Sequence, residues 1–397
     1  MKRLYLLMFL FFSFSQILYS AVYKIPFRYE QNYIIIPCNL NGNTKINLIF
    51  DTGADHHIFF EPLLFAVYKS PFVKEISVFG SDLSVEIPAY LTRPFDIQIN
   101  GYKTSSQQLI VLKDHEERMS SMIGLQIHGI LSAQIFQDYL IEIDYKKRVI
   151  NLYDHSKNKI PWKHFQSQNI EIYKSKPYLH QTIITQDGEN HHLNLLMDTG
   201  AGIGLILFAD SIKNVRIPAQ VIPSSFGFGL GGILRGVLGK IQSYYLDSNI
   251  QFNNVLTHFQ ESVAINQHQN RDGIVGNPIL EQFKWILDYK NKKLYYQKYK
   301  SNTTPLQVDR SGMLLICSGQ DFKKVFVNLV LNSSPAMEAD IRPNDELLAI
   351  NGWDLSWFNS FSSIVSKFAQ DEGTEMKLKL RRDKKIIRKK IRLENLI

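Results

Sequence analysis

The chain has 397 residues, of which 45% are hydrophobic and 12% aromatic, and its formal net charge is +8. This length suggests two or three domains, and the composition excludes a disordered chain and indicates a globular protein with hydrophobic cores. Much of the positive charge lies in RRDKKIIRKKIR from Arg381, where Ile386 and Ile387 interrupt the charges as strand residues would. We therefore expect a solvated strand or hairpin there, and no nucleic-acid partner.

Residues 1–20 have the pattern of a signal peptide. Lys2 and Arg3 precede a short apolar core over residues 4–14, which is too short for a comfortable membrane span. We predict an exported protein that is periplasmic, attached to the cell envelope or secreted. An uncleaved segment would instead anchor the protein to the membrane, and both alternatives stay open at this point.

The next segment, residues 21–153, is predicted to be a β-rich lobe. Its apolar run INLIF ends at an acid, in the order Asp51, Thr52, Gly53 and Ala54. A carboxylate at the end of a buried strand is costly unless it is satisfied or used. A Gly-Ile-Leu segment follows at Gly129, then a short helix predicted over residues 135–139 and a hairpin that turns at DYKKR.

A second lobe is predicted over residues 169–298, after a polar linker at 154–168, because the same features recur there. The run LNLLM ends in the order Asp198, Thr199, Gly200 and Ala201, 147 positions after the first copy. A Gly-Ile-Val segment at Gly273 lies 144 positions after Gly129, and a short helix is predicted over 279–283. Because both pairs of matching segments are separated by nearly the same number of residues, the sequence indicates a duplication.

A glycine-rich segment of the second lobe, SSFGFGLGGILRG from Ser224, is predicted to be a mobile β-hairpin that covers a site. Gly229 is its candidate substrate contact. A phosphate-binding loop is the alternative, but neither a Lys-Ser/Thr ending nor a βαβ context supports it. The equivalent hairpin of the first lobe is expected near Phe79, Gly80 and Ser81.

After a second linker at 299–306, residues 307–397 resemble a PDZ domain of the bacterial envelope-protease type. The resemblance rests on Ser334-Pro335-Ala336, on RPNDEL from Arg342 and on Ile350-Asn351-Gly352. Asp340 and Asn344 stand where glycine is usual, and both residue types tolerate positive φ. A helix is expected over 361–370. The resemblance implies that an extended peptide or a free C-terminus binds at the turn formed by Gly312, Met313, Leu314 and Leu315.

The duplicated acids, Asp51 and Asp198, point to one catalytic site. Two carboxyl groups that meet between equivalent halves share a proton, so one can act as a general base and the other as an acid. The glycines permit a tight turn, and the threonine hydroxyls can bond the opposite loop. Ala54 and Ala201 offer no hydroxyl to the acids, which predicts a weakly acidic or near-neutral pH optimum.

Both halves, roughly residues 22–298, resemble the aspartic peptidases, and more closely the retropepsin-like clan. The resemblance implies a mainly β fold with two duplicated acid-protease-type β-barrel lobes, a cleft between them and an added α+β domain. It also implies an aspartic endopeptidase without a cofactor, acting on peptides or proteins. Asp55 would bind the substrate backbone, where the second lobe has Gly202. The family also has a motif of two hydrophobic residues and a glycine that packs beneath the acid loop. The second lobe has it complete, ending at Gly276, whereas Ser132 replaces the glycine in the first lobe.

The sequence also allows other interpretations. His56 and His57 could bind a metal with Asp55, but adjacent residues on a strand point to opposite faces, so no metal is expected. Cys38 and Cys317 are predicted to be unpaired and buried. The alternative function is a catalytically inactive peptide-binding scaffold of the cell envelope.

Overall fold

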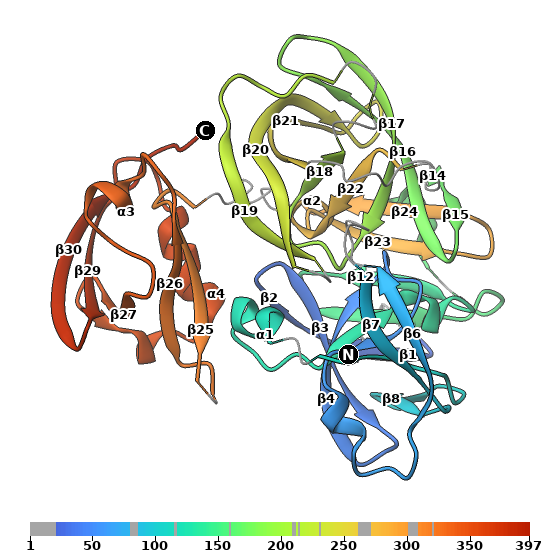
Figure 1. Cartoon of the computed structure of the whole chain (residues 1–397). Helices are drawn as coiled ribbons and strands as arrows, with labels where there is room; N and C mark the ends of the chain where they lie inside the picture. The colour runs from blue at the N-terminus through green and yellow to red at the C-terminus, as the bar shows by residue number, and fades with distance from the viewer. Residues whose placement is uncertain are drawn as a thin grey trace, which may run out of the picture.

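The computed structural model describes residues 21–79, 86–114, 117–158, 160–208, 212, 215–229, 232–260, 271–300, 309–319 and 321–397, with the backbone alone over 223–229 and 232–235. The chain is mainly β and forms two repeated lobes and a third domain (Figure 1), which confirms the predicted fold class. Residues 1–20 and 301–306, which include the predicted signal segment, lie outside the described residues. Among those described, no helix is long and apolar enough to cross a membrane.

The first lobe is a ten-stranded sheet whose central strands carry Asp51. β3 (Tyr33–Leu40) pairs antiparallel with β4 (Thr44–Asp51), which in turn pairs in parallel with β11 (Gly129–Ser132). Their apolar runs are buried, as expected for strands covered on both faces. The remaining elements are β2 (Arg28–Glu30), β5 (Ile58–Phe59), η1 (Pro62–Phe65), β6 (Phe72–Phe79), β7 (Glu86–Thr92), β8 (Ile97–Ile99), β9 (Tyr102–Lys103), β10 (Ile110–Leu112) and α1 (Arg118–Ile123).

The second lobe is an eight-stranded sheet with the same arrangement around Asp198. β16 (Lys176–Ile184) pairs antiparallel with β17 (Asn190–Asp198), and β17 pairs in parallel with β22 (Gly273–Gly276). The sheet is completed by β15 (Glu171–Tyr173), β18 (Leu205–Phe208), β19 (Ile222–Gly229), β20 (Gly232–Tyr245) and β21 (Gln251–Gln260). The duplication seen in the sequence is therefore a repeat of strand pairing.

A six-stranded sheet joins the two lobes. At its centre β12 (Leu140–Asp144) pairs with β23 (Phe283–Asp288), and β1 (Tyr23–Pro26), β13 (Val149–Tyr153), β24 (Lys293–Lys298) and β14 (Gln166–Asn169) flank this pair. One continuous hydrophobic core runs through both lobes. The lobes are thus one folding unit built across a shared sheet.

Two local predictions differ from the structure. Residues 166–168 belong to β14, which pairs with β24, although the polar, proline-containing segment 154–168 predicts a linker. η3 (Trp162–His164) precedes this strand. The two short helices also begin two residues earlier than predicted, as η2 (Ala133–Phe136) and α2 (Asn277–Leu280). The Ser132 hydroxyl caps η2, and Pro278 occupies the first turn of α2, where proline needs no amide partner.

The third domain has its own sheet and its own hydrophobic core. The sheet order is β25 (Met313–Ser318), β26 (Lys324–Val330), β27 (Glu346–Ile350), β29 (Glu375–Arg382) and β30 (Lys385–Arg392), with β28 (Trp353–Asp354) beside β27. Its helices are α3 (Pro335–Glu338), η5 (Leu355–Trp357), α4 (Phe361–Val365) and η6 (Ser366–Ala369). Asp340 and Asn344 have φ values of 52° and 70°, and the basic segment forms the hairpin β29–β30.

Candidate functional site

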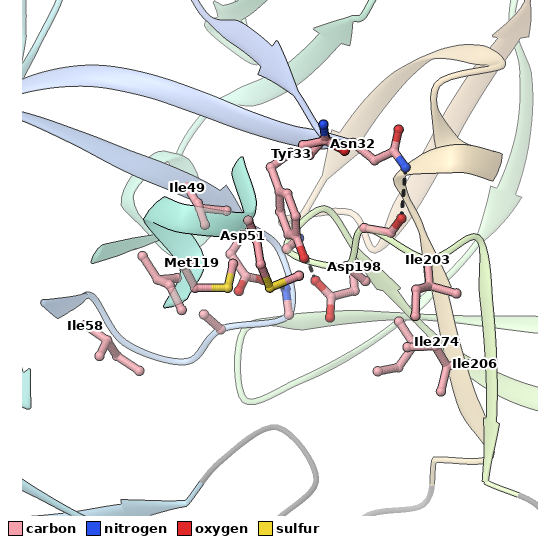
Figure 2. Close-up of a pocket in the computed structure, with 18 of the residues that line it drawn as sticks. Asn32, Tyr33, Ile49, Asp51, Ile58, Met119, Asp198, Ile203, Ile206 and Ile274 are labelled. Atoms are coloured by element: carbon pink, nitrogen blue, oxygen red, sulfur yellow. Dashed lines mark hydrogen bonds between the residues drawn. The ribbon is translucent and has the colours of Figure 1, made fainter. Parts of the chain in front are cut away.

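The two acids occupy equivalent positions at the ends of paired parallel strands. Asp51, the last residue of β4, lies opposite Ser132 of β11, and Asp198, the last residue of β17, lies opposite Gly276 of β22. Because these registers match, the shared sheet between the lobes brings the two loops together. Figure 2 shows both carboxyl groups side by side in the floor of a pocket.

Thr52 and Thr199 bind the two loops to each other through a reciprocal set of hydrogen bonds. The Thr52 hydroxyl donates to the Met197 carbonyl (2.6 Å) and accepts from the Thr199 amide (3.0 Å). The Thr199 hydroxyl donates to the Phe50 carbonyl (2.9 Å) and accepts from the Thr52 amide (3.1 Å). Both side chains are fully buried, so water cannot replace these bonds. The network holds each acid in register with the other.

The glycines after the threonines allow each loop to approach the acid of the other lobe. A Cβ on Gly53 would lie 2.7 Å from Cγ of Asp198, and a Cβ on Gly200 would collide with the carboxyl group of Asp51. Each glycine amide also donates to the acid of its own loop, at 2.6 Å for Asp51 and 2.7 Å for Asp198. Any side chain at these two positions would push the carboxyl groups apart.

The environment of the two carboxyl groups is unequal although their loops are alike. Burial, followed by the negative charge of Asp198, raises the pKa of Asp51 well above its ordinary value. Burial also raises the pKa of Asp198, but a hydrogen bond from Asp51 and the amide of Gly200 oppose that rise. The positive charges of Arg271 and Lys176 also lower the pKa of Asp198. The two acids therefore titrate as one pair, and the positive charges of Arg271 and Lys176 act on the Asp198 member of it.

Ser132 supports the first loop through one side-chain hydrogen bond, which a glycine could not make, and one from its backbone amide. Its hydroxyl donates to the Ala54 carbonyl (2.6 Å), and its amide donates to Nδ1 of His57 (3.1 Å). Nε2 of His57 then donates to the Gln107 side chain (2.9 Å), and burial lowers the pKa of His57 to about 4. His57 is therefore a neutral structural partner of Ser132, which the sequence pattern did not reveal.

The second loop rests on backbone contacts that require glycine. The amide of Gly276 donates to the Gly204 carbonyl (2.9 Å), and a Cβ on Gly276 would collide with the Ile203 carbonyl. Next to it, the buried Asn277 amide group donates to the carbonyl of Thr199 (2.6 Å) and to that of Asn32 (2.7 Å). The two lobes thus reach the same loop geometry by different means.

A cavity of about 690 Å³ opens above the acids and is lined mainly by apolar side chains. Isoleucines from both lobes form much of its wall, as Figure 2 shows for Ile49, Ile58, Ile203, Ile206 and Ile274. A cavity of this size accepts several side chains of an extended ligand. Its polar residues are few, and most of them surround the two acids.

Among the polar residues of this cavity that the sequence did not reveal are Tyr33, Lys176 and Arg271. Burial, followed by the charge of Asp198, raises the pKa of Tyr33 to about 12, and its hydroxyl accepts from the Gly202 amide. Tyr33 begins a strand whose pattern, YIII, could equally indicate a core residue. Lys176 and Arg271 have no motif around them, and only the folded chain brings them to the acids.

Asp55, the predicted substrate contact, lines the cavity and forms an ion pair with Lys176 of the other lobe (2.7 Å). The Lys176 side chain is only 9% exposed, so this pair is poorly screened by solvent. Gly202, at the equivalent position of the second lobe, packs against the Tyr33 ring, with its Cβ position 3.0 Å from Cζ. The two lobes therefore differ at this position: Asp55 of the first lobe is paired with Lys176, whereas Gly202 of the second lobe contacts the Tyr33 ring.

The two predicted covering segments correspond to β-hairpins. Gly229 ends β19 and pairs with Gly232 at the start of β20, and the residues between them lie outside the described part of the chain. In the first lobe, Phe79 ends β6 and lines the cavity together with Ile76 and Val78, whereas Gly80 and Ser81 lie outside the described residues.

The turn predicted to bind a carboxylate already holds one from its own chain. The Asp309 carboxylate accepts from the amides of Gly312 (2.7 Å) and Ser311 (3.0 Å), and Gly312 has a φ of +77°. These amides are therefore not presented to a ligand, in contrast to the expectation from the sequence. Met313, Leu314 and Leu315 do line a cavity, and it is the same cavity that contains the two acids.

No group of three or more His, Cys, Asp or Glu side chains within the described residues is arranged to hold a metal ion. His56 lines the cavity, and His57 is turned into the lobe, where Ser132 and Gln107 satisfy its ring. Cys38 and Cys317 are buried and free.

No protein-family model matches the chain, and a comparison with curated proteins gives no match. Among solved structures, the chain is similar to the crystal structure of aspartic proteinase from Irpex lacteus, with a TM-score of 0.45 and 12% sequence identity. The alignment covers 72% of this chain and 99% of that one. At this level of similarity the chemistry of the site has to be judged from its own geometry.

Proposed function

We propose that this protein is an aspartic endopeptidase that hydrolyses peptide bonds in extended substrates. The observation that carries the proposal is the pair of carboxyl groups, Asp51 (buried) and Asp198 (half-buried), at the floor of an apolar cavity. Two neighbouring carboxyl groups do not both ionise easily, so we assign one shared proton to the pair. We place it on Asp51, because the positive charges of Arg271 and Lys176 favour the negative charge on Asp198. A buried acid pair of this kind is costly to maintain and is suited to general acid–base catalysis.

In the proposed reaction, a water molecule lies between the two carboxyl groups. The charged Asp198 accepts a proton from this water as its oxygen bonds to the carbonyl carbon of the substrate, while the protonated Asp51 donates to the carbonyl oxygen. The resulting tetrahedral intermediate then collapses. Its C–N bond breaks, the amide nitrogen receives the proton held by Asp198, and one hydroxyl of the intermediate returns a proton to Asp51. A carboxylic acid and an amine then leave the site, and both acids are back in their starting protonation states.

The proposal is tested by incubating the purified chain with a library of end-blocked peptides from acidic to neutral pH. We expect cleavage within peptides, and inhibition by an analogue in which a hydroxyl-bearing tetrahedral carbon replaces the scissile carbonyl. Such an analogue should bind at least about 10²-fold more tightly than the matching substrate, because it imitates the transition state. Absence of cleavage at every pH, together with no preference for the analogue, would overturn the proposal.

Lys176→Met should shift the acid limb of the kcat/KM profile to higher pH by about one unit. The change removes a positive charge that favours ionised Asp198, and it leaves Asp55 without its ion-pair partner. Both effects raise the pKa of Asp198, so a higher pH is needed to form the general base. The exposed Lys174 lies in the adjacent turn, and Lys174→Met is the matched control. An unchanged acid limb in Lys176→Met would contradict the assigned charge on Asp198.

A further inference from the structure

The cavity above the acids does not end at the two lobes. It continues onto the third domain, where Met313, Leu314 and Leu315 of β25 and Val365 and Phe368 of α4 and η6 form one of its walls. In Figure 1, β25 and α4 lie on the side of the third domain that is next to α1 of the first lobe. The surface that would bind a peptide on this domain is therefore part of the same cavity as the acids.

The third domain is attached to both lobes at this position. Against the first lobe, the Gln31 amide donates to the Ser362 hydroxyl (2.8 Å), and a Cβ on Gly124 would lie 2.6 Å from Cβ of Phe361. Against the second lobe, Nζ of Lys240 donates to the Ile397 carbonyl oxygen (2.6 Å). Contacts to both sides of the cleft hold this wall in a defined position relative to the acids.

The chemistry of this wall favours an apolar, uncharged segment of a substrate. Its cavity-lining residues are apolar except for Asp309, and the described part of the wall contains no cation. The amides that would bind a free carboxylate are occupied by Asp309. Burial raises the pKa of Asp309 to about 6, so above that pH its negative charge also repels a free carboxylate. In addition, β25 is the edge strand of its sheet, and α1 of the first lobe, whose Met119 and Met122 also line the cavity, packs beside it.

We propose that the third domain forms an apolar subsite of the cleft and binds an internal, extended segment of the peptide substrate beyond the residues that flank the scissile bond. This inference rests on the proposed endopeptidase function, and it assigns the domain a role in substrate specificity. It implies a preference for long substrates with an apolar residue at this distance from the scissile bond, and no requirement for a free C-terminus.

The test uses end-blocked peptide analogues with a hydroxyl-bearing tetrahedral carbon at the scissile position, measured by calorimetric binding to the full chain. A short analogue spans only the acids, and two longer series add apolar residues at one end or the other. We expect one longer series to bind about tenfold more tightly than the short analogue, since each buried apolar side chain contributes on this scale. Its amidated form should bind at least as tightly as its free acid.

Val365→Asp should abolish the gain from the longer peptide and leave binding of the short analogue unchanged. Leu314→Ser provides a second, less disruptive change in the same wall. Ile386→Asp is the matched control, because Ile386 is 44% exposed on the third domain and does not line the cavity. Thermal unfolding verifies that each variant is folded.

The outcomes separate this inference from the proposed function. Failure of the short analogue to bind the wild-type chain would overturn the endopeptidase proposal and, with it, this inference. Normal binding of the short analogue without a gain from either extension would overturn the subsite alone. The subsite would also be overturned if the longer analogue still bound more tightly than the short one in both Val365→Asp and Leu314→Ser. Tighter binding of the free acid than of the amide would overturn it as well.

Discussion

Replacement of Asp198 by Asn should lower kcat/KM for a cleaved peptide by at least about 10³-fold, because the variant lacks the group that accepts the proton from water. Asp51→Asn should have a loss of similar size, since the Asn side chain cannot transfer a proton to the carbonyl oxygen of the substrate. Steady-state cleavage of a fluorogenic peptide measures both effects.

Folding of these variants should be preserved. Burial raises the pKa of both acids, so the folded state binds more protons than the unfolded state and loses stability as pH rises above the ordinary carboxyl range. An Asn removes that penalty, and we expect a Tm at neutral pH equal to or above that of the wild type. Asp138→Asn, on an exposed turn, should leave cleavage unchanged. Wild-type cleavage by Asp198→Asn would refute the proposed role of the acid pair.

Thr52→Val should destabilise the chain by about 2–4 kcal/mol and lower its Tm by roughly 5–10 °C. Valine has nearly the shape of threonine, but it leaves the Met197 carbonyl and the Thr199 amide without their partner in a fully buried place. Each unsatisfied group contributes its desolvation penalty. Calorimetry measures the stability, and kcat should fall as well because the two acids lose their alignment.

Thr52→Ser separates the hydroxyl from the methyl group. Serine keeps the hydrogen bonds and removes one methyl group, so we expect a loss of only about 1 kcal/mol and near-normal activity. Equal destabilisation by Val and Ser would show that packing of the methyl group, and not the hydrogen-bond network, holds the two loops together.

The acid loops show how much of a site a duplication can predict. Two copies of Asp-Thr-Gly-Ala, each after an apolar strand, indicated two equivalent loops, and the structure places Asp51 and Asp198 at matching strand registers. The prediction succeeded at this level because strand periodicity and turn residues are local properties of the chain. Ser132 shows the limit, since the substitution was visible but its partners, His57 and the Ala54 carbonyl, were not.

By itself, the sequence determined the mainly β class, the repeat of the two lobes and the position of an acid at the end of each central strand. Tertiary structure decided which charges face those acids. Lys176 comes beside Asp198 through the pairing of β16 with β17, and Arg271 is 73 residues from Asp198 in the chain. It also decided the surroundings of β25. The pattern of a strand predicts which side chains share a face of the sheet. Which other element packs on that face depends on contacts between segments that are distant in sequence.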